Sequence, residues 1–234
     1  MRVLVVTGAG ISAESGIPTF RGKNGYWHNL DPAKLATPEA FARDPQLVWE
    51  WYRERRQRIR EAQPNAAHGA IAKLACQANE FLLVTQNVDD LHERAGLAKE
   101  QTVQIHGNIF VTSCSRCDFG FSERNEDMQV IPRCSKCDAL MRPGVVWFGE
   151  QLDPDKIDIV ERFLGRDRCD YAIVVGTIAT FGYIVDWALR ASAGGGQLIE
   201  VNPEETPLSI FATQLLREPA AIALPRLVDQ IANC

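Results

Sequence analysis

The chain has 234 residues, of which 46% are hydrophobic and 24% are charged, as in a soluble globular protein with a substantial core. Its 30 acidic and 25 basic side chains give a net charge of −5, which argues against a nucleic-acid surface. No stretch approaches the roughly 20 apolar residues of a membrane span, and a strand-like run begins at about residue 2, so we expect a cytoplasmic protein without a leader peptide.

The first predicted element is a buried parallel strand at residues 3–6, followed by a glycine-rich turn. The residues that match the pattern G-x-G-x-x-G/A in this turn are Gly8, Gly10 and Ala13. Small residues let the backbone approach a pyrophosphate, while N–H groups at the start of the next helix face the anion. Phe20 and Arg21 follow, where a solvated helix does not need them. The turn predicts a dinucleotide site, although a glycine turn without a ligand has the same bare pattern.

The acidic residue of a hydride-transferring dinucleotide site is missing. Such enzymes carry it about 20 positions after the glycines, at the end of the second strand. The nearest candidate, Asp31, precedes Pro32 and lies in no strand pattern. The next strand-like run begins only at residue 81. We therefore expect a dinucleotide to bind in an arrangement other than that of hydride transfer.

Strand-like runs alternate with helical patterns along the chain, which is typical of a parallel α/β sheet with right-handed crossovers. The later expected strands are residues 81–85, 103–106, 171–175 and 197–201, with helical patterns at 66–78 and 184–192. Two segments, 26–60 and 110–145, interrupt the alternation and predict a smaller second domain made of a helical module and a cysteine module. The expected Rossmann-like domain then comprises residues 1–25, 61–109 and 146–234.

Residues 46–59 form a helical pattern, with Asp44 as the expected N-cap and Pro45 in the first turn. One face of this helix carries Val48, Trp51, Tyr52, Arg55 and Ile59, whereas Arg53, Arg56 and Arg60 point elsewhere. A guanidinium on an apolar face needs an anion, and Tyr52 can reach the same point. Either an internal acid or a ligand carboxylate pairs with Arg55, unless the side chain extends to solvent.

Polar side chains follow the second and third predicted strands, at the end of the sheet where ligands bind in open α/β folds. Gln86, Asn87 and Asp89 are suited to ribose hydroxyls, although Asn87 or Asp89 could instead cap the next helix. His106 ends the third strand and suits a general base, since its ordinary pKa is near 6.5. The other histidines lack this combination, and we assign structural roles to His28, His68 and His92.

Four of the seven cysteines form two C-x-x-C pairs, Cys114 with Cys117 and Cys134 with Cys137. Two such pairs can close a tetrahedral thiolate site around one zinc ion. Four thiolates leave no open coordination position, so the zinc should be structural and should supply much of the segment's folding free energy. The remaining cysteines have no such spacing: Cys76, Cys169 and Cys234.

Together these features resemble the sirtuins, which are NAD-dependent protein-lysine deacylases, from about residue 2 to residue 231. The motifs that carry the resemblance are residues 8–22, 86–89, 106–107, 142–150, 176–177 and 201–203, with the paired cysteines. The resemblance implies a Rossmann-type domain, a small zinc domain, and a cleft that NAD and acyl-lysine enter from opposite sides. It also implies that NAD is consumed, with release of nicotinamide and O-acyl-ADP-ribose.

The resemblance also assigns roles to individual residues. His106 would accept a proton from a ribose hydroxyl, while Asn87 and Asp89 would hold the ribose and nicotinamide ends. Phe20 would shield the reactive intermediate. The implied NAD-binding set is Gly8, Ala9, Gly10, Ala13, Thr19, Phe20, Arg21, Trp27, Gln86, Asn87, Asp89, Gly176, Thr177, Ile178, Asn202, Pro203 and Ala220.

The same resemblance also indicates which acyl groups are removed. Tyr52-x-x-Arg55 matches the sirtuins that remove acidic acyl groups, and Ala36 matches the small residue that widens their acyl pocket. We therefore expect succinyl- or malonyl-lysine to be preferred, with weaker deacetylation. Residues 148–150 resemble the strand edge that pairs with the substrate peptide. The expected substrate contacts are Ala36, Tyr52, Arg55, Val146, Phe148 and Gly149.

Several alternatives stay open at this point. A plain deacetylase or an ADP-ribosyltransferase could use the same cleft, and an oxidoreductase would change the absorbance of its cofactor. A zinc ribbon that binds nucleic acid would carry basic side chains around its cysteines, but residues 110–140 are slightly acidic. The expected partners are proteins that carry acyl-lysine, with no nucleic acid and no membrane, and the expected state is a monomer.

One position departs from the family pattern. Most sirtuins have a cofactor-binding serine after the Gly-Thr pair, where this chain has Ile178, and residues 179–183 also differ. Loss of one hydrogen bond weakens NAD binding by about 1 kcal/mol. We predict that Ile178→Ser lowers the KM for NAD in steady-state assays, and an unchanged or higher KM would contradict this.

Overall fold

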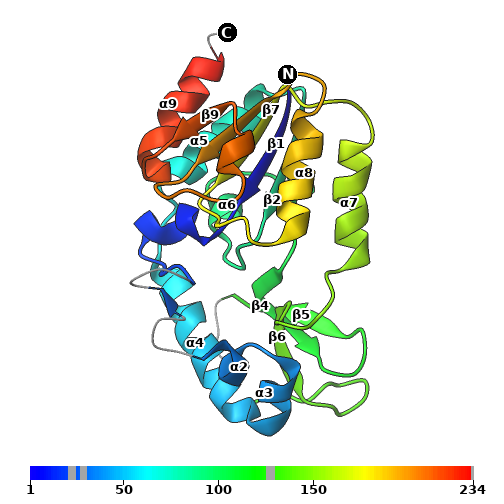
Figure 1. The fold of residues 1–234 in the computed structure, drawn as a ribbon. Helices are drawn as coiled ribbons and strands as arrows, with labels where there is room; N and C mark the ends of the chain where they lie inside the picture. The colour runs from blue at the N-terminus through cyan, green and yellow to red at the C-terminus, as the bar shows by residue number, and fades with distance from the viewer. Residues whose placement is uncertain (21–24, 27–30, 125–129, 233–234) are drawn as a thin grey trace.

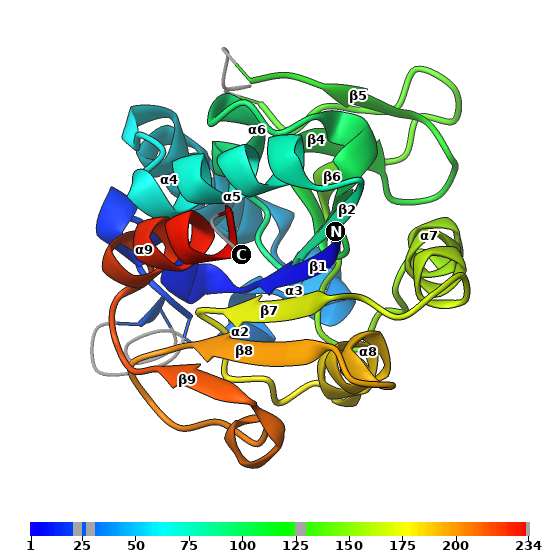
Figure 2. The same ribbon diagram turned by 90° about the horizontal axis from the view of Figure 1, so that it is seen from above.

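The computed structural model describes residues 1–20, 25–26, 31–124 and 130–232. Its main sheet has six parallel strands in the order β3-β2-β1-β7-β8-β9. Figure 2 shows β2, β1, β7, β8 and β9 side by side in this order. The strands are β1 (Arg2–Thr7), β2 (Glu80–Thr85), β3 (Thr102–Gln104), β7 (Tyr171–Val175), β8 (Gln197–Val201) and β9 (Gln214–Leu216). The structure confirms the five predicted strands of this sheet, although β3 ends two residues before the predicted end. The sixth, β9, has only three residues and no recognisable pattern.

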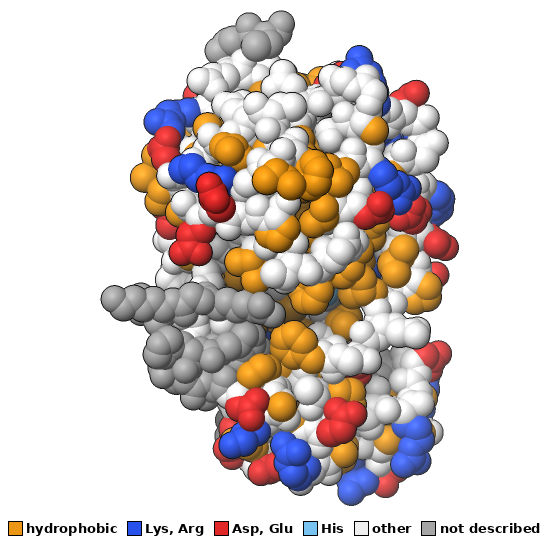
Figure 3. Space-filling view, in the orientation of Figure 1, with side chains coloured by type: hydrophobic (Ala, Val, Ile, Leu, Met, Phe, Trp, Pro, Cys, Tyr) orange, Lys and Arg blue, Asp and Glu red, His pale blue; other side chains and the backbone are white. Residues whose placement is uncertain are grey.

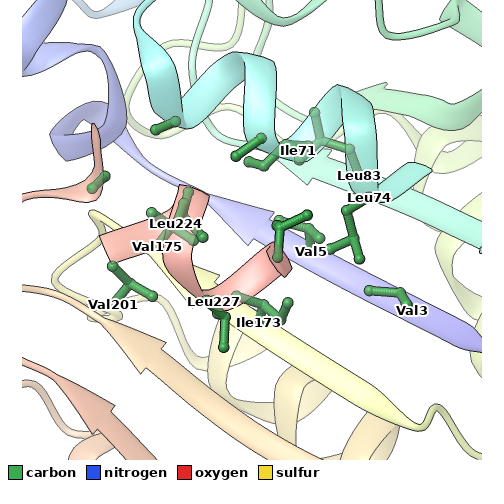
Figure 4. Close-up of a cluster of buried hydrophobic side chains, with 14 of the residues drawn as sticks. Val3, Val5, Ile71, Leu74, Leu83, Ile173, Val175, Val201, Leu224 and Leu227 are labelled. Carbon is green, nitrogen blue, oxygen red and sulfur yellow. The ribbon is translucent and has the colours of Figure 1, made fainter. Parts of the chain in front are cut away.

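Helices cover both faces of this sheet (Figure 2). One face carries α5 (Ala66–Gln77) and α9 (Ala220–Ala232), and the other carries α7 (Pro154–Leu164) and α8 (Gly182–Ser192). Because both faces are covered, all six residues of β1 are buried. Figure 4 shows the cluster on the α5 and α9 side, where Val5, Ile71 and Leu224 belong to one continuous core.

A second group of elements lies at the other end of the molecule (Figure 1). Its helices are α2 (Pro32–Leu35), α3 (Pro38–Arg43) and α4 (Pro45–Glu61). Its antiparallel sheet, in the order β5-β4-β6, contains β4 (Gly107–Cys114), β5 (Gly120–Ser122) and β6 (Met141–Val145). This antiparallel sheet packs against α4 of the predicted helical module. The domain boundaries expected from the sequence stay a prediction. We refer to these helices and this sheet as the small lobe.

Each helix of the small lobe begins with a proline after a capping side chain. The caps are Asp31, Thr37 and Asp44, whose side-chain oxygens accept backbone N–H groups at 3.0–3.1 Å. The cap predicted at Asp44 is therefore confirmed. The remaining elements of the described residues are η1 (Ala9–Ser15), α6 (Leu91–Arg94), η2 (Lys99–Gln101) and η3 (Ser209–Phe211).

Arg56 joins α4 to β4. Its Nε donates to the carbonyl oxygen of Ile109 at 2.7 Å, and its Nη2 donates to Val111 O and Thr112 Oγ1, both at 3.1 Å. The sequence predicts that Arg56 points away from the apolar face that carries Arg55. It does, but it enters a second buried interface and is fully buried there. Two backbone carbonyl oxygens and one hydroxyl oxygen therefore accept hydrogen bonds from N–H groups that burial removes from water.

Over the described part of the chain, each helix is too short or too polar to cross a lipid bilayer.

Candidate active site

A cavity of about 900 Å³ lies at the carboxyl ends of β1, β2, β7 and β8, against the small lobe. Figure 3 shows apolar side chains gathered across the middle of this side of the molecule. Most of the predicted site residues line the cavity: Gly8, Ala9, Gly10, Ala13, Thr19, Phe20, Ala36, Tyr52, Arg55, Gln86, Asn87, His106, Val146, Phe148, Gly149, Gly176, Thr177, Ile178, Asn202, Pro203 and Ala220. Asp89 lines a small adjoining cavity instead, and Arg21 and Trp27 lie outside the described residues.

The turns after β1 and β7 meet at the floor of the cavity. Gly8 N–H donates to Val175 O at 3.0 Å, and Gly10 N–H donates to Gly176 O at 2.8 Å. A Cβ atom at Gly10 would lie 2.6 Å from the Cα of Gly176, and Gly176 has a φ of +60°. These two N–H groups are therefore used within the protein, and the expectation that N–H groups at the start of the next helix face an anion stays a prediction. The glycines instead let two turns approach closely, and the predicted helix begins as the 3-10 helix η1.

Ser12, Asn87 and Asp89 form a buried chain of hydrogen bonds. Asn87 Nδ2 donates to Ser12 Oγ at 3.1 Å, and Ser12 Oγ donates to Asp89 Oδ2 at 2.9 Å. Asp89 Oδ1 also accepts from the N–H of Leu91, the first residue of α6, although the N-cap of that helix is Asp90. Burial raises the pKa of Asp89 to about 6. The sequence analysis missed Ser12, although it lies inside the glycine motif and is buried.

His106 lies two residues beyond β3 and contacts the cavity through its imidazole. Its Nδ1 is 3.0 Å from Gln86 O, and its Nε2 is 2.7 Å from Tyr183 Oη. A carbonyl oxygen only accepts, so Nδ1 carries the proton in the neutral ring and Nε2 keeps its lone pair. Burial lowers the pKa of His106, and the cationic Lys156 lowers it further. The ring is therefore neutral at pH 7, as a base must be.

Arg55 is 5% exposed and faces the cavity. Its guanidinium carbon lies 4.7 Å from the ring centre of Trp51, 5.1 Å from that of Phe20 and 5.3 Å from that of Tyr52. No carboxylate of the described residues forms an ion pair with it, and its buried Nε has no hydrogen-bond partner there. The alternative of a solvent-exposed arginine is therefore wrong. The aromatic rings offset part of the cost of burying this charge, and Arg55 also interacts electrostatically with Asp89. Pairing with a ligand carboxylate stays a prediction.

Tyr52 is buried beside Arg55, and its Oη accepts a hydrogen bond of 2.9 Å from Trp147 Nε1. Arg142 stacks on the Trp147 ring at 3.5 Å from its centre and pairs with Glu150 at 2.5 Å. An indole nitrogen only donates, so the oxygen of Tyr52 accepts and its own proton is available for another acceptor. Burial raises the pKa of Tyr52, which keeps the phenol protonated.

The expected peptide-pairing edge is a turn in this structure. Phe148 N–H donates to Ala36 O at 3.0 Å, and Glu150 N–H donates to Trp147 O at 3.1 Å. Gly149 has a φ of +86°. The strand edge predicted at residues 148–150 is therefore wrong as a description of this structure, because β6 ends at Val145. Pairing of a peptide with this segment stays a prediction.

The four cysteines of the two C-x-x-C pairs converge in the small lobe. Their Sγ atoms all lie within 4.8 Å of one another, with 3.5 Å between Cys114 and Cys137 and 3.6 Å between Cys117 and Cys134. A tetrahedral zinc site with Zn–S bonds of about 2.3 Å has sulfur atoms roughly 3.8 Å apart. The four thiols therefore fit a zinc ion that would hold the two turns together, and they do not line the cavity.

Two further histidines are buried behind the hydrogen-bonded chain. His68 and His92 have ring centres 4.8 Å apart. His68 Nδ1 accepts from Asn65 N–H at 3.2 Å, and His92 Nε2 lies 3.2 Å from Thr7 Oγ1. Burial lowers the pKa of His68 to about 4 and that of His92 well below 6.5. These contacts agree with the structural roles predicted for both.

The sequence and the fold match known proteins. Residues 8–181 match the model of the Sir2 family. The chain is 45% identical over 230 residues to NAD-dependent protein deacylase 1 of Archaeoglobus fulgidus, covering 98% of this chain and 92% of that protein.

Two solved structures show the same fold with ligands bound. A complex of a Sir2 homologue with NAD has a TM-score of 0.90 and 44% identity, covering 99% of this chain and 90% of that one. A complex of Sir2 with a p53 peptide and NAD has a TM-score of 0.81 and 29% identity, covering 100% and 94%.

We predict one zinc ion per chain, and we expect its removal by a strong chelator to unfold the small sheet. Binding of the zinc ion by four thiolates supplies much of the folding free energy of so small a segment. Metal analysis and thermal unfolding before and after chelation test this, with Cys134→Ser as a variant that removes one ligand. A metal-free protein with an unchanged melting temperature would contradict the prediction.

We predict that buried His68 contributes a loss of stability as the pH falls from about 6.5 to about 4, while the raised pKa of Asp89 contributes in the opposite direction. Unfolded histidine binds a proton near pH 6.5, but folded His68 binds one only near pH 4, so protons favour the unfolded state between these values. Chemical unfolding at several pH values should give a shallower slope for His68→Gln than for the original chain. Equal slopes would exclude His68 as the cause, since the carboxylates are common to both proteins.

Proposed function

This chain belongs to the Sir2 family and is an NAD-dependent sirtuin enzyme, and from that premise we propose that it removes acidic acyl groups, succinyl or malonyl, from lysine side chains. Its deacylase relatives favour this reaction over ADP-ribosyl transfer. The observation that supports the acyl preference is the state of Arg55, which is buried at the cavity without a carboxylate partner among the described residues.

A buried guanidinium is costly unless an anion pairs with it. The rings of Trp51, Phe20 and Tyr52 offset part of that cost, but a ring face does not satisfy an N–H donor. A terminal carboxylate of a succinyl or malonyl group would accept two parallel hydrogen bonds from Arg55. An acetyl group has no such oxygen and would leave the guanidinium as it is.

Tyr52 supports the same substrate class. Because Trp147 donates to its oxygen, the hydroxyl proton of Tyr52 is free to donate to an acceptor in the cavity. A carboxylate is the strongest acceptor that an acyl chain can bring there. Ala36 also lines the cavity, and its small side chain leaves room for the longer acyl group.

NAD fits the other part of the cavity. The glycine turns would lie against its phosphates, and Gln86, Asn87 and Asn202 would bind its hydroxyl and amide groups. Bound NAD supplies an electrophilic ribose carbon and a nicotinamide leaving group. His106, neutral and with Nε2 towards the cavity, would take the proton of a substrate hydroxyl, while Asp89 and Ser12 hold Asn87 in place.

We predict that Arg55→Met lowers kcat/KM for a succinyl-lysine peptide about 10- to 100-fold while largely keeping that for the acetyl peptide. A hydrogen bond to a charged group contributes about 1.5–3 kcal/mol, and only the acidic acyl group makes it. Mass spectrometry of a panel of acyl peptides with NAD measures both rates.

The matched control for this variant is Arg58→Met. Arg58 lies in the same helix, α4, about one turn after Arg55. Arg58 pairs with Glu54 on the surface, so its loss should change neither rate. Equal losses for both peptides in Arg55→Met would reject the acyl preference and leave a plain deacetylase.

We predict that His106→Ala lowers turnover about 100- to 10,000-fold, because it removes the base. Nicotinamide release with and without acyl peptide measures the reaction, and thermal unfolding shows whether the variant keeps its fold. Full activity in a folded variant would overturn the assignment of His106. Nicotinamide release that does not need the peptide would instead indicate transfer of ADP-ribose.

A further inference from the structure

The segment after β7 brings Tyr183 against the histidine of the site. Tyr183 is the second residue of α8, and its hydroxyl lies 2.7 Å from His106 Nε2. His106 follows β3 at one edge of the sheet, whereas α8 follows β7. The contact therefore joins two separate parts of the cavity wall.

The direction of this hydrogen bond follows from the other ring nitrogen. Nδ1 of His106 donates to Gln86 O, so neutral Nε2 has only a lone pair to offer and the hydroxyl of Tyr183 donates to it. This is the same lone pair that must receive a proton from a substrate hydroxyl. Two donors cannot both use it at full strength.

Aromatic packing holds the Tyr183 ring beside the histidine. Its ring stacks on Phe181 with a centre distance of 5.6 Å and an angle of 16°, and it packs on Trp187 at 5.0 Å. Phe181 also meets the His106 ring edge-to-face at 5.7 Å. Tyr183 and Phe181 both line the cavity, so the pair forms part of its wall next to the base.

We propose that Tyr183 is a positioning residue for His106: its hydroxyl holds Nε2 as an unprotonated acceptor in the free enzyme and is displaced when a substrate hydroxyl binds there. The inference rests on the proposed role of His106 as the base. In the reaction the proton of the substrate hydroxyl goes to Nε2, and Tyr183 keeps its own proton. Burial raises the pKa of Tyr183, which agrees with a phenol that stays neutral.

Other groups also act on the ring and belong in the test. Lys156 on α7 donates to Gln104 O at 2.8 Å, and its charge disfavours a protonated His106. Asp153, at the cap of α7, favours the charged form of Lys156. Neither group is changed by a substitution at Tyr183, so a difference between variants reports on the hydroxyl alone.

The experiment compares the original chain with Tyr183→Phe, which keeps the stacked ring and removes only the hydroxyl. Histidine NMR of the free protein should show the pKa of His106 rising by about 0.5–1 unit, because a hydrogen bond to the neutral ring is lost. The acid limb of the pH–rate profile should move upwards by the same amount. At a pH at which His106 is unprotonated in both proteins, kcat/KM for NAD should be a few-fold higher in Tyr183→Phe than in the original chain, because the competing donor is gone.

Tyr171→Phe is the matched control, since it removes a hydroxyl at the opposite end of β7 from the cavity. It should leave the pKa of His106 and the rates unchanged. An unchanged pKa in Tyr183→Phe would overturn the proposal, and so would a tenfold or larger loss of kcat, which would make the hydroxyl a proton carrier. The NMR comparison needs no substrate, so it tests the contact even if His106→Ala shows that the proposed function is wrong.

Discussion

The close approach of two turns is the constraint on which the site depends. Gly10 and Gly176 bring the backbones that follow β1 and β7 into direct contact, and no side chain fits between them. The carboxyl ends of the central strands therefore meet at a narrow floor, and the polar residues that follow β2 and β3 surround it. The same contact explains why the glycine amides are used within the protein and why the cavity opens above the turns.

Two neighbouring arginines of α4 show how one helix serves both structure and binding. Arg56 is satisfied by carbonyl oxygens of β4, so it fixes the helix to the small sheet. Arg55 has aromatic rings around it and forms no ion pair with a carboxylate of the described residues, which is the basis for proposing that a ligand supplies one. Because Arg56 and the cysteine cluster both act on the small sheet, the direction in which Arg55 faces depends on interactions outside the cavity.

The sequence predicted most of the sheet and of the cavity wall because these features depend on local patterns. Continuous apolar runs mark the buried strands, and residues after strand ends meet at one edge in a parallel sheet. What it missed depends on contacts between distant residues. Nothing near Arg56 in the sequence indicates that β4 will supply its acceptors, and nothing near Tyr183 indicates that its hydroxyl reaches His106. The acceptor of the Gly10 N–H group is likewise set by the turn after β7, whose position cannot be inferred from the residues around Gly10.

Both edge strands of the main sheet are very short. β3 and β9 have three residues each, while the strands between them have five or six. Figure 2 shows β9 at one side of the sheet. Unpaired backbone N–H and C=O groups of an edge strand can pair with a strand from another molecule, and a short edge strand offers few such groups. The inner strands, which are longer and apolar, are thereby kept from pairing with other molecules. Short edge strands in this way reduce the tendency of the fold to aggregate.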